Sequence, residues 1–388
     1  MKRVVFFLFS LFFFCFSVYA EEFDITGEYV SLYNMNEDML IYIKNDTKKT
    51  SIASLTKMMT TLVAIENIDD LEKVITIKER DFDGTVGYSK AGFSVGDKVT
   101  YLDLLYGIIL PSGADAVNAI VNNTLGYNSF IKKMNETAKK IGMNDTSFAN
   151  PIGKDDENNY STSSDIAKLL KYALKNETFK KVFTTKSYKT SNGINLESTV
   201  NSYKSILNTS EILGAKSGFT KNAGRCLASI TTLNGVDYLL VVINSSTSSP
   251  SNAVKDTITI YDYYSSNYGY KNILNDDTFI KEIPVDLSKE KTYKITGNED
   301  VNKYLKNGDE VTYEYVGSDK ITFNTKNGSK LGVVNIYNGD ELIATSNVYL
   351  ENNIEYYPIV TYVLIFIGVI FILLIIRKSK KKHRRRRR

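Results

Sequence analysis

Three short motifs hold the residues of this chain that could carry out nucleophilic chemistry. The first is Ser54-Leu55-Thr56-Lys57, the second is Ser112-Gly113, and the third is Lys216-Ser217-Gly218. The only histidine among the 388 residues is His383, in the last six positions. A serine hydrolase that uses imidazole as its general base needs a histidine in its folded body. If Ser54 is a nucleophile, a lysine must therefore take its proton, and Lys57 lies one helical turn away.

The segment around Ser54 is expected to form a helix that buries Lys57. Apolar residues recur at helical spacing from Ile52 through Ile65, so Ser54 falls in the first turn. Positions i and i+3 share a helix face, so the two side chains can touch. Burial and the positive end of the helix dipole both disfavour a charged lysine there. A neutral amine can then activate the hydroxyl.

Ser-x-x-Lys is weak evidence when it stands alone. The same spacing occurs at Ser129–Lys132, Ser288–Lys291 and Ser379–Lys382, where a solvated helix face is the usual interpretation. A lone loop serine or a lysine at the end of a strand is equally common. The order and spacing of all three motifs together favour catalysis.

A second helix positions Ser112. Thr100-Tyr101-Leu102-Asp103 has the form of a capping box, apolar residues continue to Ile109, and Pro111 ends the run. The pattern is helical again over Asp115–Val121. Ser112-Gly113 therefore occupies a break between two helices, from which a serine can point into a cleft.

The remaining pattern predicts an α+β domain of helices packed around an antiparallel sheet, with the first and last strands adjacent. The expected strands are Tyr29–Tyr33, Leu40–Ile43, Ile212–Lys216, Arg225–Thr232 and Val236–Ile243, and the further helices are 128–141, 163–175 and Asp256–Tyr264. The residue pattern changes near residue 276, where short β-rich runs alternate with Gly, Asn and Asp turns. Residues 276–352 are expected to form a small all-β domain, with strands at Thr292–Thr296, Glu310–Tyr315, Lys320–Thr325, Lys330–Tyr337 and Glu341–Tyr349. Asn338-Gly339-Asp340 is a hairpin signal.

The two ends of the chain predict export and anchoring. Residues 1–20 have a basic start, an apolar run and the ending Val18-Tyr19-Ala20, which is typical of a cleaved signal peptide; an uncleaved anchor is the alternative. The uncharged stretch 359–376 is long enough for a transmembrane helix. Ten Lys and Arg residues follow within the tail 377–388, which predicts a single-pass membrane protein with a cytoplasmic C-terminus and a catalytic body outside the cell.

The net charge limits the binding partners of the expected exported body, and the cysteine content limits how that body can be stabilised. Without Lys2, Arg3 and the ten charges of the tail, 36 basic residues face 44 acidic ones, so residues 21–358 are acidic. This balance argues against nucleic acid as a partner, and the arginine run is expected to meet anionic lipid headgroups. Cys15 lies in the expected signal segment, which leaves Cys226 as a single cysteine. The exported body must therefore be stabilised by its core without an intrachain disulfide.

With these motifs the chain resembles the serine-type D-alanyl-D-alanine carboxypeptidases, the low-molecular-mass penicillin-binding proteins. The resemblance runs over residues 24–270, the expected catalytic domain. The matching segments are Ala53–Thr60, Val95–Asp97, Asp103–Gly107, Leu110–Gly113, Asp155–Asn158, Tyr160–Thr162 and Ala223–Leu227. The β-rich segment resembles the second domain of the family more weakly. The family fold is a penicillin-binding/β-lactamase-like domain.

The resemblance implies a role for each motif residue. Ser54 would attack the carbonyl between two D-alanines of a peptidoglycan stem peptide, and Lys57 would accept its proton. Ser112 would help carry a proton to the leaving amine. In the third motif, Lys216 would keep the site electropositive and help hold Lys57 neutral, and Ser217, next to Gly218, would contact the substrate carboxylate. The backbone N–H groups of Ser54 and Phe219 would form an oxyanion hole.

Under the same resemblance, water would release the acyl-enzyme, β-lactams would be covalent inhibitors, and no metal or organic cofactor would be needed. The sequence departs from the family at four places. Ala114 replaces an asparagine, with Asn118 one turn later, and Ser217 replaces a threonine. Ile152 stands where the family often has histidine. Residues 244–252 lack the arginine that receives the terminal carboxylate in many relatives, and Lys255 is the nearest basic residue after them.

Two other functions stay open on the sequence. A β-lactamase-like hydrolase of the same fold is one, although no Glu-x-x-Leu-Asn motif lies between the second and third motifs. The other is a non-catalytic wall-binding homologue in which Ala114 marks a decayed site.

Overall fold

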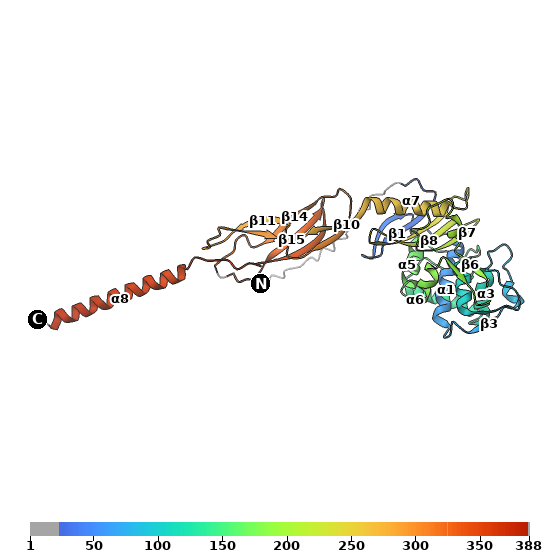
Figure 1. The fold of residues 1–388 in the computed structure, drawn as a ribbon, viewed down its shortest axis with the longest axis horizontal. Coiled ribbons are helices and arrows are strands. Elements are labelled where there is room, and N and C mark those ends of the chain that lie inside the picture. Colours follow the sequence, from blue (N-terminus) through green and yellow to red (C-terminus); the bar gives the residue numbers. More distant parts are fainter. Residues whose placement is uncertain (1–22, 324, 387–388) are drawn as a thin grey trace, which may run out of the picture. The chain divides into compact units, whose positions relative to one another are not determined.

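The computed structural model describes residues 23–323 and 325–386, and the chain divides into one unit ending at Ser266 and another beginning at Asn267 (Figure 1). The expected signal peptide, residues 1–20, lies outside the described residues. The domain limits 24–270 and 276–352 stay a prediction from composition.

A five-stranded antiparallel sheet organises the first unit, in the order β2-β1-β9-β8-β7. Its strands are β1 (Tyr29–Asn34), β2 (Met39–Lys44), β7 (Gly214–Thr220), β8 (Gly224–Leu233) and β9 (Val236–Ser245). The predicted hairpin and the adjacency of first and last strands are confirmed, since Leu32 pairs with Leu240. The predicted end of β7 at Lys216 is wrong. The strand continues to Thr220 because pairing with β8 extends to Gly224.

Helices cover both faces of this sheet. In Figure 1, α7 (Asn252–Asn267) lies on one face and the other helices lie on the opposite face. Those helices are α1 (Thr56–Asn67), α2 (Tyr101–Ile109), α3 (Ala114–Asn123), α4 (Tyr127–Ile141), α5 (Ser163–Ala173) and α6 (Glu177–Thr184). Helix α1 is buried from Thr56 to Ala64, so it forms the centre of the helical layer. The expectation that Ser54 lies in its first turn is wrong. Ser54 lies in a preceding 3-10 turn, η1 (Ala53–Leu55).

The start of α2 is fixed by the predicted capping box. The Thr100 amide donates to Asp103 Oδ2 at 2.9 Å, and the Asp103 amide donates to Thr100 Oγ1 at 3.0 Å. Asp103 also accepts bonds from the amide and hydroxyl of Ser191. The carboxylate thereby ties α2 to the small hairpin β5 (Ser187–Lys189) and β6 (Asn195–Glu197), while β3 (Val74–Thr76) pairs with β4 (Lys98–Thr100). Two further 3-10 turns are η2 (Glu79–Phe82) and η3 (Asn201–Tyr203).

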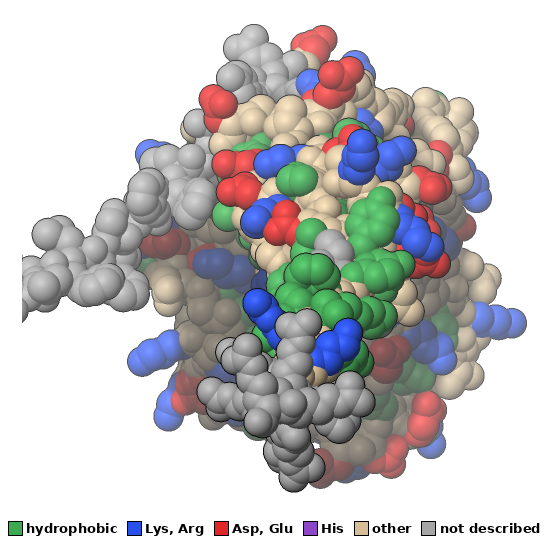
Figure 2. Space-filling view, turned by 90° about the vertical axis from the view of Figure 1, so that its left-hand side faces the viewer, with side chains coloured by type: hydrophobic (Ala, Val, Ile, Leu, Met, Phe, Trp, Pro, Cys, Tyr) green, Lys and Arg blue, Asp and Glu red, His purple; other side chains and the backbone are tan. Residues whose placement is uncertain are grey.

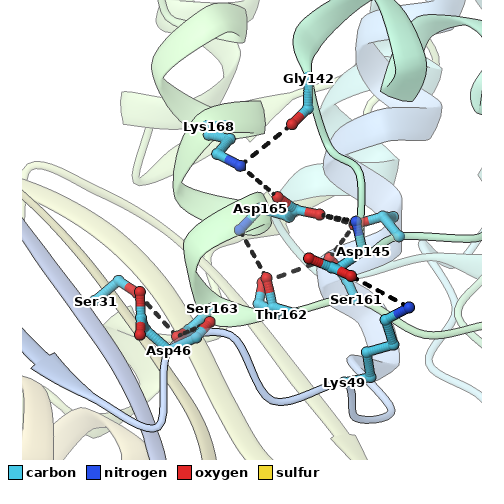
Figure 3. A network of polar contacts seen from close by, with 11 residues as sticks. Ser31, Asp46, Lys49, Gly142, Asp145, Ser161, Thr162, Ser163, Asp165 and Lys168 are labelled. Atoms are coloured by element: carbon cyan, nitrogen blue, oxygen red, sulfur yellow. Dashed lines mark hydrogen bonds and ion pairs between the residues drawn. The ribbon is translucent and has the colours of Figure 1, made fainter.

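A polar network holds the start of α5 against its neighbours (Figure 3). The Thr162 hydroxyl caps the helix by accepting from the Asp165 amide at 3.0 Å. The Asp165 carboxylate accepts from the Asp145 amide at 2.9 Å and from Lys168 at 2.8 Å. Next to the cap, Ser163 Oγ lies 2.8 Å from Ser31 Oγ on β1. The helix is thus joined to the sheet by satisfied buried polar groups.

The second unit contains the all-β fold that the sequence predicts. Its strands are β10 (Tyr268–Leu274), β11 (Phe279–Pro284), β12 (Thr292–Thr296), β13 (Val301–Lys306), β14 (Val311–Gly317), β15 (Lys330–Asn338) and β16 (Glu341–Tyr349). They pair as β10-β13, β11-β12 and β14-β15-β16. The hairpin signal is confirmed, because Asn338 pairs with Glu341. The strand expected at Lys320–Thr325 is wrong; there, Ile321 makes an isolated bridge to Val285.

The last helix, α8 (Ile359–Arg386), is the candidate membrane span. Among the described residues, Tyr362–Lys380 is the one helical stretch that is long and apolar enough, with a mean hydropathy of 2.3 and no part of it buried. Figure 2 shows apolar side chains gathered beside Lys and Arg side chains near this end of the chain. This composition is compatible with membrane anchoring.

Candidate active site

Ser54 and Lys57 lie side by side in the helical layer. Lys57 Nζ is 2.8 Å from Ser54 Oγ and donates to the Ile152 carbonyl at 2.7 Å. The lysine is 1% exposed. Burial lowers the pKa of Lys57 to about 7, although the negative charge of Asp115 opposes this shift. A neutral amine at this distance can accept the serine proton.

The turn that carries Ser54 is strained and tightly enclosed. Ala53 has a φ of +46°, in the left-handed region. A Cβ at Gly153, which has a φ of +81°, would lie 2.0 Å from the Ala53 carbonyl oxygen, and a Cβ at Gly218 would lie 3.0 Å from the Ser54 nitrogen. Only glycine at these two positions lets the neighbouring loop and strand β7 approach Ser54 this closely.

Ser112 occupies the predicted break between α2 and α3, also with a left-handed φ of +66°. The next residue, Gly113, has no room for a side chain, since a Cβ would lie 2.7 Å from the Ala91 nitrogen. Behind it, the buried Asp115 carboxylate accepts from the amides of Ala91, at 2.7 Å, and Gly92, at 3.2 Å. Asp115 therefore fastens a neighbouring loop to the start of α3.

Lys216 and Ser217 come from strand β7, at the edge of the sheet. Lys216 is fully buried and donates to the Ser217 carbonyl at 2.8 Å. Burial, and to a lesser extent the charge of Lys57, lower the pKa of Lys216 well below its ordinary value. Burial is the main cause of the lowered Lys57 pKa, and the charge interaction between Lys57 and Lys216 shows that the two amines lie near one another. The expected role of Lys216 in holding Lys57 neutral stays a prediction. The Ser217 hydroxyl lies 2.6 Å from Thr199 Oγ1.

The motif residues meet at one cleft of about 540 Å³. Its lining includes five of the seven predicted site residues, namely Ser54, Ser112, Ser217, Gly218 and Phe219. Lys57 and Lys216 do not line the cleft. Both are buried, Lys57 against the Ser54 hydroxyl and Lys216 against the Ser217 carbonyl. Among the described residues, no group of three His, Cys, Asp or Glu side chains is arranged to hold a metal ion.

Three residues near the site were missed by sequence reasoning. Thr199 and Arg225 line the cleft, and Asp115 lies behind it. Asp115 follows the second motif by two positions, and Arg225 belongs to the segment Ala223–Leu227, so both carried a signal. Thr199 lies in a loop without a motif.

Asn118 and Lys255, which could have replaced the missing asparagine and arginine of the family pattern, do not line the cleft. Asn118 Nδ2 donates to the Asp83 carbonyl at 2.9 Å. Lys255 is exposed on α7 and is absent from the cleft lining. The amide and the cation that the family pattern supplies at these places are therefore not replaced by these side chains.

The geometry agrees with comparisons to known proteins. Residues 17–247 match the family model described as D-alanyl-D-alanine carboxypeptidase, and residues 268–356 match the C-terminal domain of penicillin-binding protein 5. The chain is 28% identical over 330 residues to the D-alanyl-D-alanine carboxypeptidase DacF of Bacillus subtilis, covering 83% of this chain and 84% of the relative. It is 33% identical over 227 residues to a D-alanyl-D-alanine carboxypeptidase of Streptomyces sp. strain K15, covering 54% and 78%.

Solved structures have the same fold. Penicillin-binding protein 5 from Haemophilus influenzae aligns with a TM-score of 0.62 at 22% identity, over 87% of this chain and 99% of that one. The Streptomyces K15 DD-transpeptidase aligns with a TM-score of 0.55 at 30% identity, over 63% and 98%. The predicted fold class, helices around an antiparallel sheet followed by an all-β domain, is confirmed. This chain belongs to the D-alanyl-D-alanine carboxypeptidase family, the low-molecular-mass penicillin-binding proteins, and is a serine-type enzyme of that family.

Proposed function

We propose that this enzyme is anchored in the cell membrane and removes the terminal D-alanine from peptidoglycan stem peptides through an acyl-enzyme on Ser54. The observation that carries the proposal is the 2.8 Å approach of Lys57 Nζ to Ser54 Oγ, with a lysine whose pKa is lowered to about 7. At neutral pH about half of such amines are neutral and able to accept a proton.

In the acylation step, Ser54 Oγ attacks the carbonyl carbon of the last peptide bond while Lys57 takes the hydroxyl proton. The oxyanion that forms accepts hydrogen bonds from the backbone N–H groups of Ser54 and Phe219. The C–N bond then breaks. The proton reaches the leaving nitrogen through Ser112, so D-alanine departs as a neutral amine and Lys57 is again unprotonated.

In the second step, water attacks the Ser54 ester. Lys57 accepts a proton from the water and returns it to Ser54 Oγ as the bond between Oγ and the carbonyl carbon breaks, so the tetrahedral intermediate collapses to the shortened peptide and the free Ser54 hydroxyl. Lys216 and Ser217 contribute from strand β7. The Ser217 hydroxyl, paired with Thr199, is a hydrogen-bond donor for the substrate carboxylate, and the buried Lys216 amine donates to the carbonyl of the same serine.

The test is D-alanine release from a peptide that ends in D-Ala-D-Ala, measured with the purified full-length protein. Ser54→Ala should abolish release. Ser129→Ala is a matched control, because Ser129 begins another Ser-x-x-Lys pair but is exposed at the start of α4. Release by the Ser54→Ala variant equal to the unaltered enzyme would refute the proposed nucleophile.

Labelling by penicillin separates this function from the two alternatives. We expect intact-protein mass spectrometry to show a stable penicilloyl adduct on Ser54. Rapid turnover of penicillin would instead favour a β-lactamase, and complete absence of the adduct would favour a non-catalytic wall-binding protein. The Ser54 adduct and D-alanine release together are the result that supports the carboxypeptidase.

The acyl-enzyme can also pass to an amine. The Streptomyces K15 relative, whose structure is that of a DD-transpeptidase, is 30% identical to this chain. Adding a glycine or D-amino acid acceptor to the peptide assay would reveal a transfer product by mass spectrometry. A product ratio that rises with acceptor concentration would add transpeptidation as a second activity.

Helix α8 is proposed as the anchor, with the catalytic unit outside the cell and the basic end of the chain in the cytoplasm. An apolar stretch of this length, followed at once by Lys and Arg, supports this orientation. Deleting residues 359–388 should move the protein from the membrane fraction to the soluble fraction with D-alanine release retained. Protease added to intact protoplasts should remove the catalytic unit; protection of that unit would reverse the topology.

A further inference from the structure

We propose that Arg225 binds the terminal carboxylate of the peptide substrate. The inference rests on the proposed carboxypeptidase reaction and identifies a specificity residue for it. A carboxypeptidase acts only at a free C-terminus, so its cleft needs a cation that can pair with a carboxylate. The sequence from Asn244, near the end of β9, to Asn252, where α7 begins, contains no lysine or arginine.

Arg225 reaches the cleft from the second strand of the sheet. It lies on β8 directly opposite Phe219 of β7, the residue that follows the third motif. Both side chains line the same cleft as Ser54 and Ser217. The Arg225 guanidinium carbon lies 3.9 Å from the centre of the Phe219 ring, so the two planar groups form a cation–π contact. Phe219 is 48% exposed, which leaves this pair open to a ligand.

The guanidinium is not used by the protein in other ways. Arg225 Nε is buried without a hydrogen-bond partner among the described residues. Within that part of the chain, the Arg225 side chain makes no ion pair or hydrogen bond, and the Phe219 ring is the one group that engages its guanidinium. A buried donor without an acceptor is costly and calls for an explanation. A stacked guanidinium keeps its N–H groups in the plane of the fork, where a carboxylate can accept two of them.

The other charged residues of the cleft do not fit this role. Asp155 has the wrong sign, and its carboxylate accepts from Thr220 Oγ1 at 2.7 Å. Lys221 is exposed in the turn between β7 and β8. Arg225 is therefore the fixed cation of the lining, in the same cleft as the Ser217 and Thr199 hydroxyl pair that can donate to the same carboxylate.

Two peptides that differ in one group test the proposal. One ends in D-Ala-D-Ala with its free carboxylate, and the other ends in the primary amide. In Arg225→Gln, kcat/KM for the acid should fall about ten- to hundredfold, the range of a lost charge-assisted contact. The value for the amide should change less than about threefold, so the preference of the enzyme for acid over amide should largely disappear. Arg225→Lys should recover part of the preference.

Lys221→Gln serves as the matched control, since it removes the neighbouring cation of the same cleft. We expect it to keep the preference for the acid. The inference is wrong if Arg225→Gln lowers both substrates equally, if it lowers neither, or if Lys221→Gln causes the loss. Because Ser54 and Lys57 are unchanged in all three variants and the amide peptide carries no terminal carboxylate, a retained kcat/KM for the amide in Arg225→Gln shows that the site is folded. D-Alanine release by the unaltered enzyme tests the proposed function separately.

Discussion

Acylation of Ser54 by a penicillin is expected to rise about tenfold between pH 6 and pH 8 and then level off. The neutral fraction of an amine with a pKa of about 7 grows from roughly one tenth to nine tenths over this range. A lowering from 10.5 to about 7 means that burial disfavours the charged amine by about 5 kcal/mol. The free-energy penalty is this large because only 1% of Lys57 is exposed to solvent.

The assay is the second-order rate constant for labelling by a fluorescent penicillin, measured by stopped flow at intervals of half a pH unit from about 5.5 to about 9.5, a range that brackets the expected inflection. A lysine with an ordinary pKa would give a rate that still climbs about tenfold per pH unit at pH 9. That result, or a rate independent of pH, would refute Lys57 as the base. Asp115→Asn offers an internal check: because the charge of Asp115 raises the pKa of Lys57, its removal should move the inflection to lower pH.

Three further outcomes are expected from the same contacts. Gly153→Ala should destabilise the fold by about 2 kcal/mol or more and reduce penicillin labelling, because its Cβ would collide with Ala53; Gly193→Ala, which has open space, should label normally. Asp165→Ala should lower the free energy of unfolding, measured in urea, by about 2–4 kcal/mol, because it leaves buried hydrogen-bond donors without an acceptor. Asp145→Ala removes a half-exposed ion pair and should lower it by less than about 1 kcal/mol. Between pH 7 and pH 9 stability should increase, because the unfolded state binds the Lys57 proton more tightly; Lys57→Met should weaken this slope, and an unchanged slope would contradict it.

Local chemistry made much of the catalytic unit predictable. The capping box at Thr100 and Asp103 fixes where α2 begins, and Pro111 fixes where it ends, so the break at Ser112 followed from three residues. Helical spacing likewise placed Lys57 against Ser54. The type of turn at Ser54 did not follow, because its 3-10 geometry depends on close packing by Gly153 and Gly218 from distant segments.

The misses have one physical cause, which is that pairing between distant segments outweighs local preference. Ser217 and Gly218 are poor strand residues, yet β7 runs through them because β8 supplies its partners. The same register brings Arg225 opposite Phe219 and so into the cleft; the segment Ala223–Leu227 marked this region, but its place beside Phe219 depends on the strand pairing. At Lys320–Thr325 the reverse applies: the residues favour a strand, but Ile321 finds only a single bridge.

The pairing of β1 with β9 has a consequence for how the chain acquires its shape. Tyr29–Asn34 is made first, but its partner Val236–Ser245 emerges about two hundred residues later. Thr26 and Gly27 likewise wait for Asp256, whose carboxylate they donate to. The opening hairpin thus spends most of synthesis as an unmatched edge, vulnerable to association with other chains. Closure of such remote partners is slow, so factors that shield emerging segments should matter more for yield than the final stability does.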